Sequence, residues 1–436
     1  MTRKNMMLVL SGSALGLTSV ASAGTPDFDR AYAAELRADT AAHTSLLQAG
    51  GSGHDGFFHI GDGSGNNRLN IGGLLQFRYV FNNRDSGDFA GTGNEDAGMG
   101  FETHHTQLNF GGNVISPNWE YGITLEFGTG DGGNDSAGSN GNVRDSWVQY
   151  NFEGDNSGTF VKFGQFVSPV LPEDAASDAV GLASSRSVAN EFFSGGRIQG
   201  ITLGHGNDQY KGTITLHDGM GDQAAGTPGS ENTEWQSEAA DYGFAARFDY
   251  KIEGDWAQFG DATSWKGSNN AFRVGGGFNY QSGGNTGGLT TAPTTDATYL
   301  LWTVDATYEG NGWNAHAAII GNNYDPDVGL EISHTGFMVQ GGYFVQDDVE
   351  LFARYESIDV DSDLGLAEDT QSFLTFGGNY YLTPQSHAAK FTADFVYALS
   401  DAGALGTPGG LGLGDTGLAG GSDEELVFRA QFQLVF

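Results

Sequence analysis

The chain has 436 residues, with 70 glycines, 30 phenylalanines and 16 tyrosines but no cysteine, and only 17% of its residues are charged. Its formal net charge of −35 argues against nucleic acid as a partner, because phosphate binding requires the opposite sign. A composition without cysteine and rich in glycine and aromatic residues is not that of a typical cytosolic enzyme. It fits a secreted protein that needs no disulfides.

Residues 1–23 have the features of a secretory signal peptide. Arg3 and Lys4 supply a positive start, residues 6–17 are apolar, and residues 21–23 form an A-x-A cleavage site. The apolar run is shorter than the roughly 20 residues that a membrane-spanning helix needs. No later run reaches that length, so a membrane-embedded form of this chain must be a β-barrel.

Residues 24–67 are predicted to be a periplasmic N-terminal region. Residues 27–49 are rich in Ala, Leu, Glu and Arg, which favours a short helix. Its apolar spacing fits both a small coiled coil and a flexible helical linker. The glycine-rich stretch over residues 50–67 then forms a joint to the domain that follows.

From residue 68 to the end, apolar and polar residues alternate in sixteen segments, as expected for β-strands with two different faces. Sixteen is an even number, as a single-chain bacterial barrel needs, and several apolar faces begin or end in Tyr or Trp, where an aromatic girdle would lie. The sequence therefore predicts an all-β fold, a 16-stranded antiparallel transmembrane β-barrel over residues 68–436, in the bacterial outer membrane. The apolar faces span residues 71–81, 104–112, 119–127, 148–152, 161–163, 201–203, 210–216, 242–250, 272–280, 300–308, 313–319, 337–345, 349–355, 374–382, 391–399 and 426–436.

The last segment ends on Phe436 without a polar tail. A terminal strand leaves an unpaired edge, which a barrel removes by pairing its last strand with its first. A C-terminal Phe on such a strand resembles the signal read by the barrel-assembly machinery. The predicted partners are therefore this machinery, through Phe436, and the outer-membrane lipid.

The connections are of two kinds. Short ones, such as residues 116–118, 310–312 and 346–348, are expected in the periplasm. Long ones are rich in Gly, Asp, Asn and Ser, carry most of the acidic excess, and are expected outside the cell. They span residues 84–98, 129–142, 219–238, 324–333, 358–370 and 401–423.

Basic residues gather on the strand face that points into the predicted lumen. Inward acids nearly balance them, and for any one residue the simpler interpretation is solvation of a water-filled wall. Together, the basic residues suggest a positive track. The inward basic residues are Arg78, Lys162, Lys211, Arg247, Lys251, Arg273, Arg354, Lys390 and Arg429, and the inward acids are Glu120, Glu126, Asp145, Asp241, Asp249, Asp305, Glu350, Glu356 and Asp394.

Residues 166–196 interrupt the alternation between the fifth and sixth strands. This stretch is rich in Ala and Ser, contains Pro169 and Pro172, and differs from the Gly- and Asp-rich outer loops. It is predicted to fold inward as a constriction loop, with Arg186 and Arg197 in or beside it.

Three stretches carry a resemblance to a known family: K-F-G-Q-F-V-S-P at 162–169, S-R-S-V-A-N-E-F-F-S-G-G-R-I-Q-G at 185–200 and H-H-T-Q-L-N-F-G-G-N at 104–113. They resemble the phosphate-selective porins, whose fifth strand ends in a G-Q-F-K-x-P-type motif that precedes an E-R-S-L-A-N-A-F-x-P-G-R-type segment. The resemblance covers essentially the whole mature chain. It implies a 16-stranded homotrimer with one pore in each subunit.

The chain departs from the family pattern at several basic positions. The family's E-R-S is Ser185-Arg186-Ser187, its R-R pair on the second strand is His104-His105, and a lysine is replaced by Val167. These changes thin the basic ladder. The predicted function is therefore passive diffusion of small hydrophilic solutes and ions, with a modest anion preference rather than phosphate specificity. The alternative is a structural or adhesive surface barrel with cation-binding acidic loops.

No enzymatic constellation, cofactor site or metal site is predicted. His104 and His105 are strand neighbours, which normally point to opposite faces and cannot chelate one ion together. Asp62-x-Ser64-x-Asn66 and Asp359-x-Asp361-x-Asp363 have calcium-loop spacing but lack the glutamate at the twelfth position.

Overall fold

A computed structural model describes residues 52–54, 58–84, 97–128, 141–153, 158–220, 240–283, 297–364, 369–400, 413–418 and 424–436. The chain divides into a unit of residues 1–50 and a unit of residues 51–436, and all described residues belong to the second. The predicted signal peptide and the predicted helix over residues 27–49 therefore lie outside the described residues.

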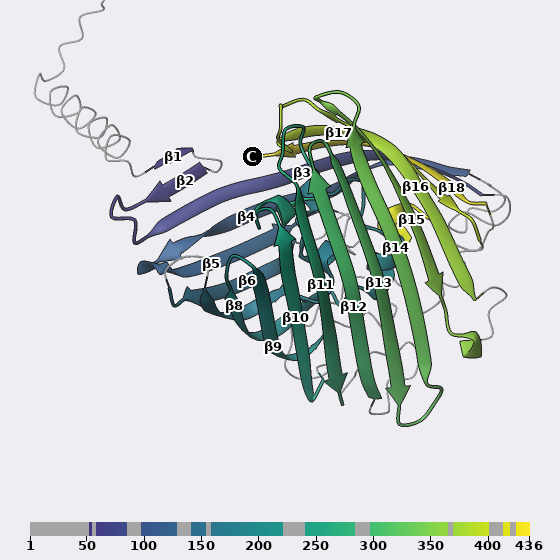
Figure 1. The fold of residues 1–436 in the computed structure, drawn as a ribbon, viewed down its shortest axis with the longest axis horizontal. Helices are drawn as coiled ribbons and strands as arrows, with labels where there is room; N and C mark the ends of the chain where they lie inside the picture. Colours follow the sequence, from purple (N-terminus) through teal and green to yellow (C-terminus); the bar gives the residue numbers. More distant parts are fainter. Residues whose placement is uncertain are drawn as a thin grey trace, which may run out of the picture. The chain divides into compact units, whose positions relative to one another are not determined.

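Sixteen antiparallel strands close into one ring, which confirms the predicted β-barrel (Figure 1). The sheet holds eighteen strands, and two short ones, β1 and β2, lie outside the ring. β18 pairs with β3 to close it. The ring strands are β3 (Arg68–Asn83), β4 (Ala97–Val114), β5 (Ser116–Glu126), β6 (Asn142–Asn151), β7 (Thr159–Val167), β8 (Arg197–Gly206), β9 (Tyr210–Met220), β10 (Tyr242–Glu253), β11 (Ala271–Ser282), β12 (Ala297–Gly310), β13 (Trp313–Pro326), β14 (Ile332–Phe344), β15 (Val349–Asp359), β16 (Thr370–Tyr381), β17 (Ala389–Ala398) and β18 (Leu426–Val435).

Both edges of the seam between β18 and β3 carry additional backbone pairing. β1 (Ser52–His54) pairs with β2 (Phe58–Gly61), and β2 pairs with β3, so two short strands lie in the glycine-rich stretch predicted as a joint. At the other end of the chain, Phe436 exchanges two backbone hydrogen bonds with Gly73, at 2.8 and 3.1 Å. The last residue is therefore fixed at the seam.

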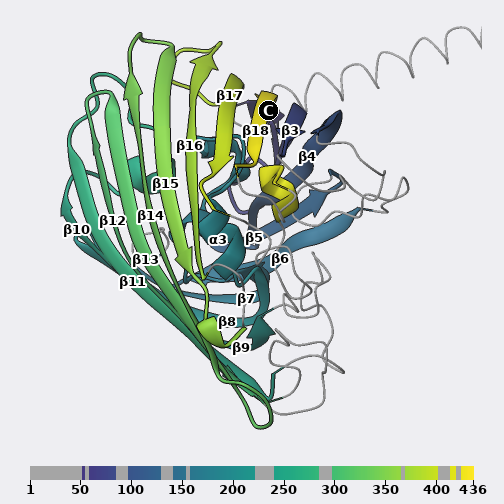
Figure 2. The ribbon, with the colours of Figure 1, turned by 90° about the vertical axis from the view of Figure 1, so that its right-hand side faces the viewer.

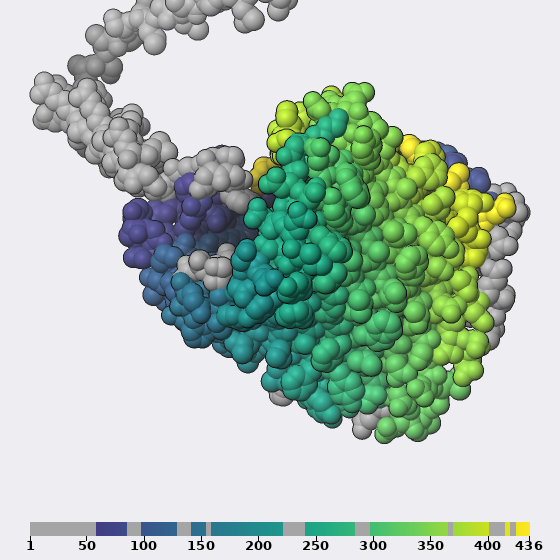
Figure 3. Space-filling model, in the orientation of Figure 1, coloured from purple at the N-terminus to yellow at the C-terminus, as the bar shows by residue number. Residues whose placement is uncertain are grey.

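The alternating pattern sorts side chains between the two faces of the ring, as predicted. On β12, Leu300, Trp302 and Val304 face outward and are 37%, 37% and 60% exposed, whereas Leu301 and Thr303 between them are almost fully buried. Figure 3 shows the wall formed by the teal to yellow strands as a continuous surface. An apolar band of this extent is typical of a surface covered by lipid. No helix among the described residues is long and apolar enough to cross a membrane.

The connections differ between the two ends of the ring. At the short-turn end, β12 and β13 are joined by Asn311 and Gly312 alone, both with positive φ, which is the Asn-Gly pattern of a tight hairpin. At the opposite end, the long-connection end, the connections include residues 85–96, 129–140, 221–239, 284–296 and 401–412, which lie outside the described part of the chain.

One connection at the short-turn end is long. Residues 254–270, between β10 and β11, contain the short helix η4 (Gln258–Gly260) and two tryptophans, Trp256 and Trp265.

Residues 168–196, called the inner segment below, follow β7 and contact the inward faces of strands on several sides of the ring. They contain α2 (Pro172–Ala175), η2 (Asp178–Val180) and α3 (Val188–Phe193). α3 begins where the Ser187 side chain accepts a hydrogen bond from the N–H of Asn190, a typical N-cap. Figure 2 shows α3 enclosed by the ring, with β14 to β16 on one side and β5 and β6 on the other.

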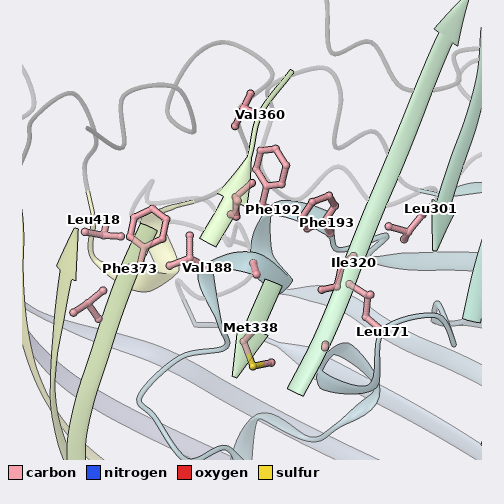
Figure 4. Close-up of a cluster of buried hydrophobic side chains, with 14 of the residues drawn as sticks. Leu171, Val188, Phe192, Phe193, Leu301, Ile320, Met338, Val360, Phe373 and Leu418 are labelled. Carbon is pink, nitrogen blue, oxygen red and sulfur yellow. The ribbon is translucent and has the colours of Figure 1, made fainter. Parts of the chain in front are cut away.

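An apolar cluster holds α3 against one wall of the ring. Phe192 and Phe193 pack beside inward-facing residues of β12 to β16, including Ile320, Met338 and Phe373 (Figure 4). An inward-facing apolar patch is unexpected in a water-filled barrel, because apolar side chains are stable only where another surface covers them. The sequence predicts a uniformly polar inward face, and this patch is a departure from that prediction.

β-bulges correct the sequence analysis at two positions on the opposite wall. His104 was placed on the outward face of the second strand, but the register with β3 shifts beside it, and His104 and His105 are both buried, at 2% and 3% exposure. Their ring centroids lie 4.4 Å apart, so these neighbours do not point to opposite faces. On β6 a second bulge leaves Arg144 unpaired in the ladder and turns it inward.

Candidate functional site

Asp178, at the start of η2, joins the inner segment to the wall formed by β4 and β6. Its carboxylate accepts hydrogen bonds from Arg144 at 2.7 Å and from the Gln107 amide at 2.7 Å. Arg186 of the inner segment pairs with the same carboxylate at 2.5 Å. His105 lies 3.8 Å from it and also contacts Glu126 at 2.8 Å. Asp178 is therefore the centre of a buried charged cluster.

The charges of the inner segment depend on this cluster. Burial alone would raise the pKa of Asp178, but Arg186 and Arg144 hold it well below its usual range. Burial alone would lower the pKa of Arg186. The nearby acids, Asp178 foremost, have the opposite and larger effect, so the net shift of this pKa is upward. Both groups are therefore charged at neutral pH. Glu191 on α3 behaves in the opposite way, because burial and the nearby Asp415 raise its pKa well above the usual range.

The wall from β15 to β18 holds the inner segment mainly through hydrogen bonds to the backbone of the inner segment. Asp394 accepts the N–H of Ser184 at 2.9 Å, and Glu356 accepts the N–H of Ala189 at 2.8 Å. Side chains of this wall also donate to backbone carbonyls: Lys390 to Gly181 (2.8 Å), Gln433 to Ala179 (2.9 Å), Asn379 to Leu182 (3.0 Å) and Arg354 to Arg186 (3.1 Å).

Most of the basic residues predicted to line the pore have carboxylate partners. Arg197 on β8 lies 3.3 Å from Asp145, and Arg273 on β11 lies 3.6 Å from Asp249. The remaining pairs are Arg429 with Asp394 (2.7 Å), Arg247 with Asp305 (2.9 Å) and Asp249 (2.6 Å), Arg354 with Glu356 (2.8 Å), and Arg78 with Glu102.

Lys162 and Lys211 differ from these arginines in having no carboxylate partner in the part of the chain that the structure describes. Among the described residues, neither ammonium has a carboxylate within 4.0 Å. Lys162 lies over the ring of Trp147 at 4.5 Å, and Lys211 over the ring of Trp256 at 4.7 Å. An ammonium can rest on an aromatic face without a direct ion pair. Asp145 and Glu120 act on Lys162, and Asp249 acts on Lys211, only from beyond ion-pair distance.

Two cavities inside the ring are lined by the inner segment. The larger, about 640 Å³, lies between the inner segment and the wall from β3 to β8, and Asn109, Arg144, Asp145 and Arg197 line it. The smaller, about 110 Å³, is lined by the inner segment, by Arg273, His316 and Arg354, and by residues 259–262 of the 254–270 connection. Arg186 and Asp178 contribute to both.

Arg144 and the 254–270 connection are the parts of the site that sequence reasoning missed. Arg144 has outward parity, and only the bulge on β6 brings it to Asp178. The 254–270 connection carried a visible signal, because its two tryptophans distinguish it from the other connections. Among the described residues, no three His, Asp or Glu side chains are arranged to hold a metal ion.

An outward apolar band, an inward charged face and internal cavities define this fold as an outer-membrane channel. Residues 76–402 match the family model described as phosphate-selective porin O and P, and the chain belongs to that family. No curated protein sequence matches it significantly.

Solved porin structures share the fold at low sequence identity. The anion-selective porin from Comamonas acidovorans is 15% identical with a TM-score of 0.56, over 84% of this chain and 99% of that one. The Salmonella typhi OmpF complex with daunomycin is 14% identical with a TM-score of 0.55, over 85% and 98%. The trimer form of in-vitro folded OmpT from Vibrio cholerae is 14% identical with a TM-score of 0.50, over 84% and 99%.

The protein is therefore a porin of the bacterial outer membrane, a channel for passive diffusion of small hydrophilic solutes and ions. Its family and fold are those of a channel rather than an enzyme.

Proposed function

We propose that the inner segment is the constriction of this channel and that the main passage runs along the wall from β3 to β8. The apolar cluster around Phe192 and Phe193 favours this, because it fills the space between α3 and the wall from β13 to β16 with apolar side chains. The larger cavity and its charged lining lie on the proposed passage side.

The channel would have a modest anion preference and no strict phosphate specificity. The observation that carries this proposal is the contrast between Lys162 and Lys211, which lack a carboxylate partner, and Arg247, Arg354 and Arg429, which have one. A paired arginine contributes little net field, whereas an unpaired lysine attracts anions. The structurally similar Comamonas acidovorans porin is itself anion-selective.

The reversal potential in a salt gradient tests this preference. The protein is reconstituted into planar bilayers, with KCl at different concentrations on the two sides. The expected sign corresponds to weak anion preference at high salt, where charges on exposed loops are screened within a Debye length of about 3 Å at 1 M. Strong cation preference under these conditions would contradict the proposal.

Of the eleven basic residues predicted in the lumen or beside the constriction loop, nine would then fall into two groups. Lys162 and Lys211 act on permeating ions directly. Paired residues shape the lumen and hold the inner segment: Arg78, Arg186, Arg197, Arg247, Arg273, Arg354 and Arg429.

The proposed assembly is a homotrimer that the barrel-assembly machinery inserts after removal of residues 1–23, with residues 24–67 on the periplasmic side. The family resemblance and the trimer form of the OmpT structure support a trimer. The position of Phe436 at the seam supports a role for the last residue in closure, because a Cβ at Gly73 would collide with its ring. A heat-sensitive trimer band on native gels tests the oligomer, and its absence from folded protein would contradict it.

A further inference from the structure

The 254–270 connection reaches far beyond the two strands that it joins. Beside β9, the Trp256 indole donates to the carbonyl of Asn207 at 2.8 Å. At its other end, Trp265 packs against Tyr381 and His387, with ring centroids 4.7 and 5.4 Å apart. Tyr381 ends β16, whereas the connection joins β10 to β11. The connection therefore extends across part of the short-turn mouth of the ring.

The anchors of the connection are buried. Thr263 and Ser264 are 2% and 1% exposed, and the Thr263 hydroxyl lies 3.1 Å from the hydroxyl of Tyr381. Tyr381 in turn donates to Glu350 at 2.6 Å. Buried aromatic contacts of this kind hold a loop in one position. The connection is therefore a fixed part of the lumen rather than an open periplasmic turn.

The middle of the connection meets the inner segment. The N–H of Ala262 donates to the carbonyl of Val180 at 3.3 Å, and Val180 ends η2 directly after the Asp178 cluster. Phe259, Gly260 and Asp261 line the smaller cavity together with Arg273 of β11. The inner segment enters the ring from the long-connection end and the 254–270 connection from the short-turn end, and the two touch inside the ring.

We infer that the 254–270 connection is a second constriction of the channel, which acts in series with the inner segment and helps to set the size and charge of the solutes that pass. This inference rests on the porin function given above. The connection contributes Asp261 and a small uncovered residue, Gly260, to the lining of the smaller cavity.

A single-cysteine experiment tests this inference, since the chain has no cysteine of its own. A Cβ built at Gly260 meets nothing within 4 Å, so Gly260→Cys should fold. Charged methanethiosulfonate reagents are added to single channels in a planar bilayer. The expected result is a stepwise fall in conductance, with reversal-potential shifts of opposite sign for the cationic and anionic reagents. The control is Gln346→Cys, exposed in the turn between β14 and β15 at the same mouth, which should react without a change in conductance.

A second variant keeps the inference testable if the cysteine variant does not fold. Trp265→Ala removes the anchor beside Tyr381 and should raise the conductance and the open-channel noise. Unchanged conductance in either variant overturns the second constriction, provided that the unmodified protein conducts. Absence of conductance from the folded unmodified protein would instead contradict the porin function, so the two failures are distinguishable.

Discussion

The two walls of the barrel hold the inner segment by different physical means. The wall from β3 to β8 holds it through charge, with Asp178 between Arg144 and Arg186. The wall from β12 to β16 adds the apolar cluster around Phe192 and Phe193 to the polar contacts of Arg354, Glu356 and Asn379. Charged groups are stable beside water or a partner, whereas apolar contacts exclude water. The contrast therefore indicates which wall borders the water-filled path.

The walls also differ in regularity. Every pairing from β11 through β18 and back to β3 keeps its register without a shift, whereas β3 to β6 contain shifts beside His104, Asn113 and Arg144. A bulge places an extra side chain on a chosen face. Two of these bulges direct His104 and Arg144 toward the charged cluster, so the irregular wall is the one that carries the proposed passage.

The largest expected effect follows removal of Asp178. Asp178→Ala leaves Arg144 and Arg186 buried without their carboxylate, and breaking a buried pair costs about 3–5 kcal/mol. The inner segment should detach from the β3–β8 wall, with higher and noisier single-channel conductance and a shift toward anions. Asp327→Ala, an exposed acid between β13 and β14, serves as control. Wild-type conductance from folded Asp178→Ala would mean that charge does not hold the segment.

Loss of an aromatic residue on the other wall should have a similar but smaller effect on conductance. Phe193 is 1% exposed, and Phe193→Ala should destabilise the docking of α3 by about 3–5 kcal/mol. The Asp178 cluster would still restrain the segment, so protease sensitivity at Arg186 should rise more than conductance. Phe101→Ala, on the lipid-facing side, should leave both unchanged. If trypsin cleaved the two variants equally slowly, the apolar cluster would not be what holds α3 in place.

Removal of a single lumen lysine should have a smaller effect, on ion selectivity rather than on conductance. Lys162→Ala removes an unpaired lumen charge, with an expected effect on the order of 0.5 kcal/mol, or about a twofold shift of the permeability ratio toward cations. Arg68→Ala, at the start of β3 and outside the lining of both cavities, is the control that removes a cation elsewhere. Reversal potentials measure both, and equal values would remove Lys162 from the set of pore residues.

The smallest expected effect is a pH dependence of the inner segment. The pKa of Glu191 is raised in the folded state, so the folded chain binds a proton at higher pH than the unfolded chain does. The segment should therefore become more stable as the pH falls from 7 toward the ordinary glutamate pKa of about 4.3, because proton binding favours the folded state. Asp178 has a lowered pKa and contributes stability that is lost only at still lower pH. Open-channel noise should fall between pH 7 and 5, and Glu191→Gln should abolish this change.

The sequence predicted the barrel because the outer face of a membrane strand obeys one simple rule. Lipid requires apolar side chains at every second residue, and Leu300, Trp302 and Val304 follow it. The inner face follows no single rule, since different parts of it border water, the apolar cluster around Phe192 and Phe193, and ion pairs. Parity alone therefore cannot show that Leu301 and Met338 belong to the apolar cluster formed with the inner segment.

The charged cluster could not be predicted for a related reason. Alternation gives a face only while the strand register is regular, and the bulges at His104 and Arg144 reverse it. The basic residues were placed in the lumen from parity alone. Their carboxylate partners lie on other strands, such as Asp394 on β17 for Arg429 on β18, and strand parity cannot reveal such pairs.

The central claim is that water and ions pass beside the β3–β8 wall and not beside the apolar cluster around Phe192 and Phe193. Two cysteine variants test it. Asn109→Cys lies in the lining of the larger cavity, and Met338→Cys lies in the apolar cluster, where the native side chain is 1% exposed. A charged thiol reagent applied to single channels should block Asn109→Cys in steps and leave Met338→Cys unmodified. Rapid block of Met338→Cys, with Asn109→Cys unaffected, would contradict the account.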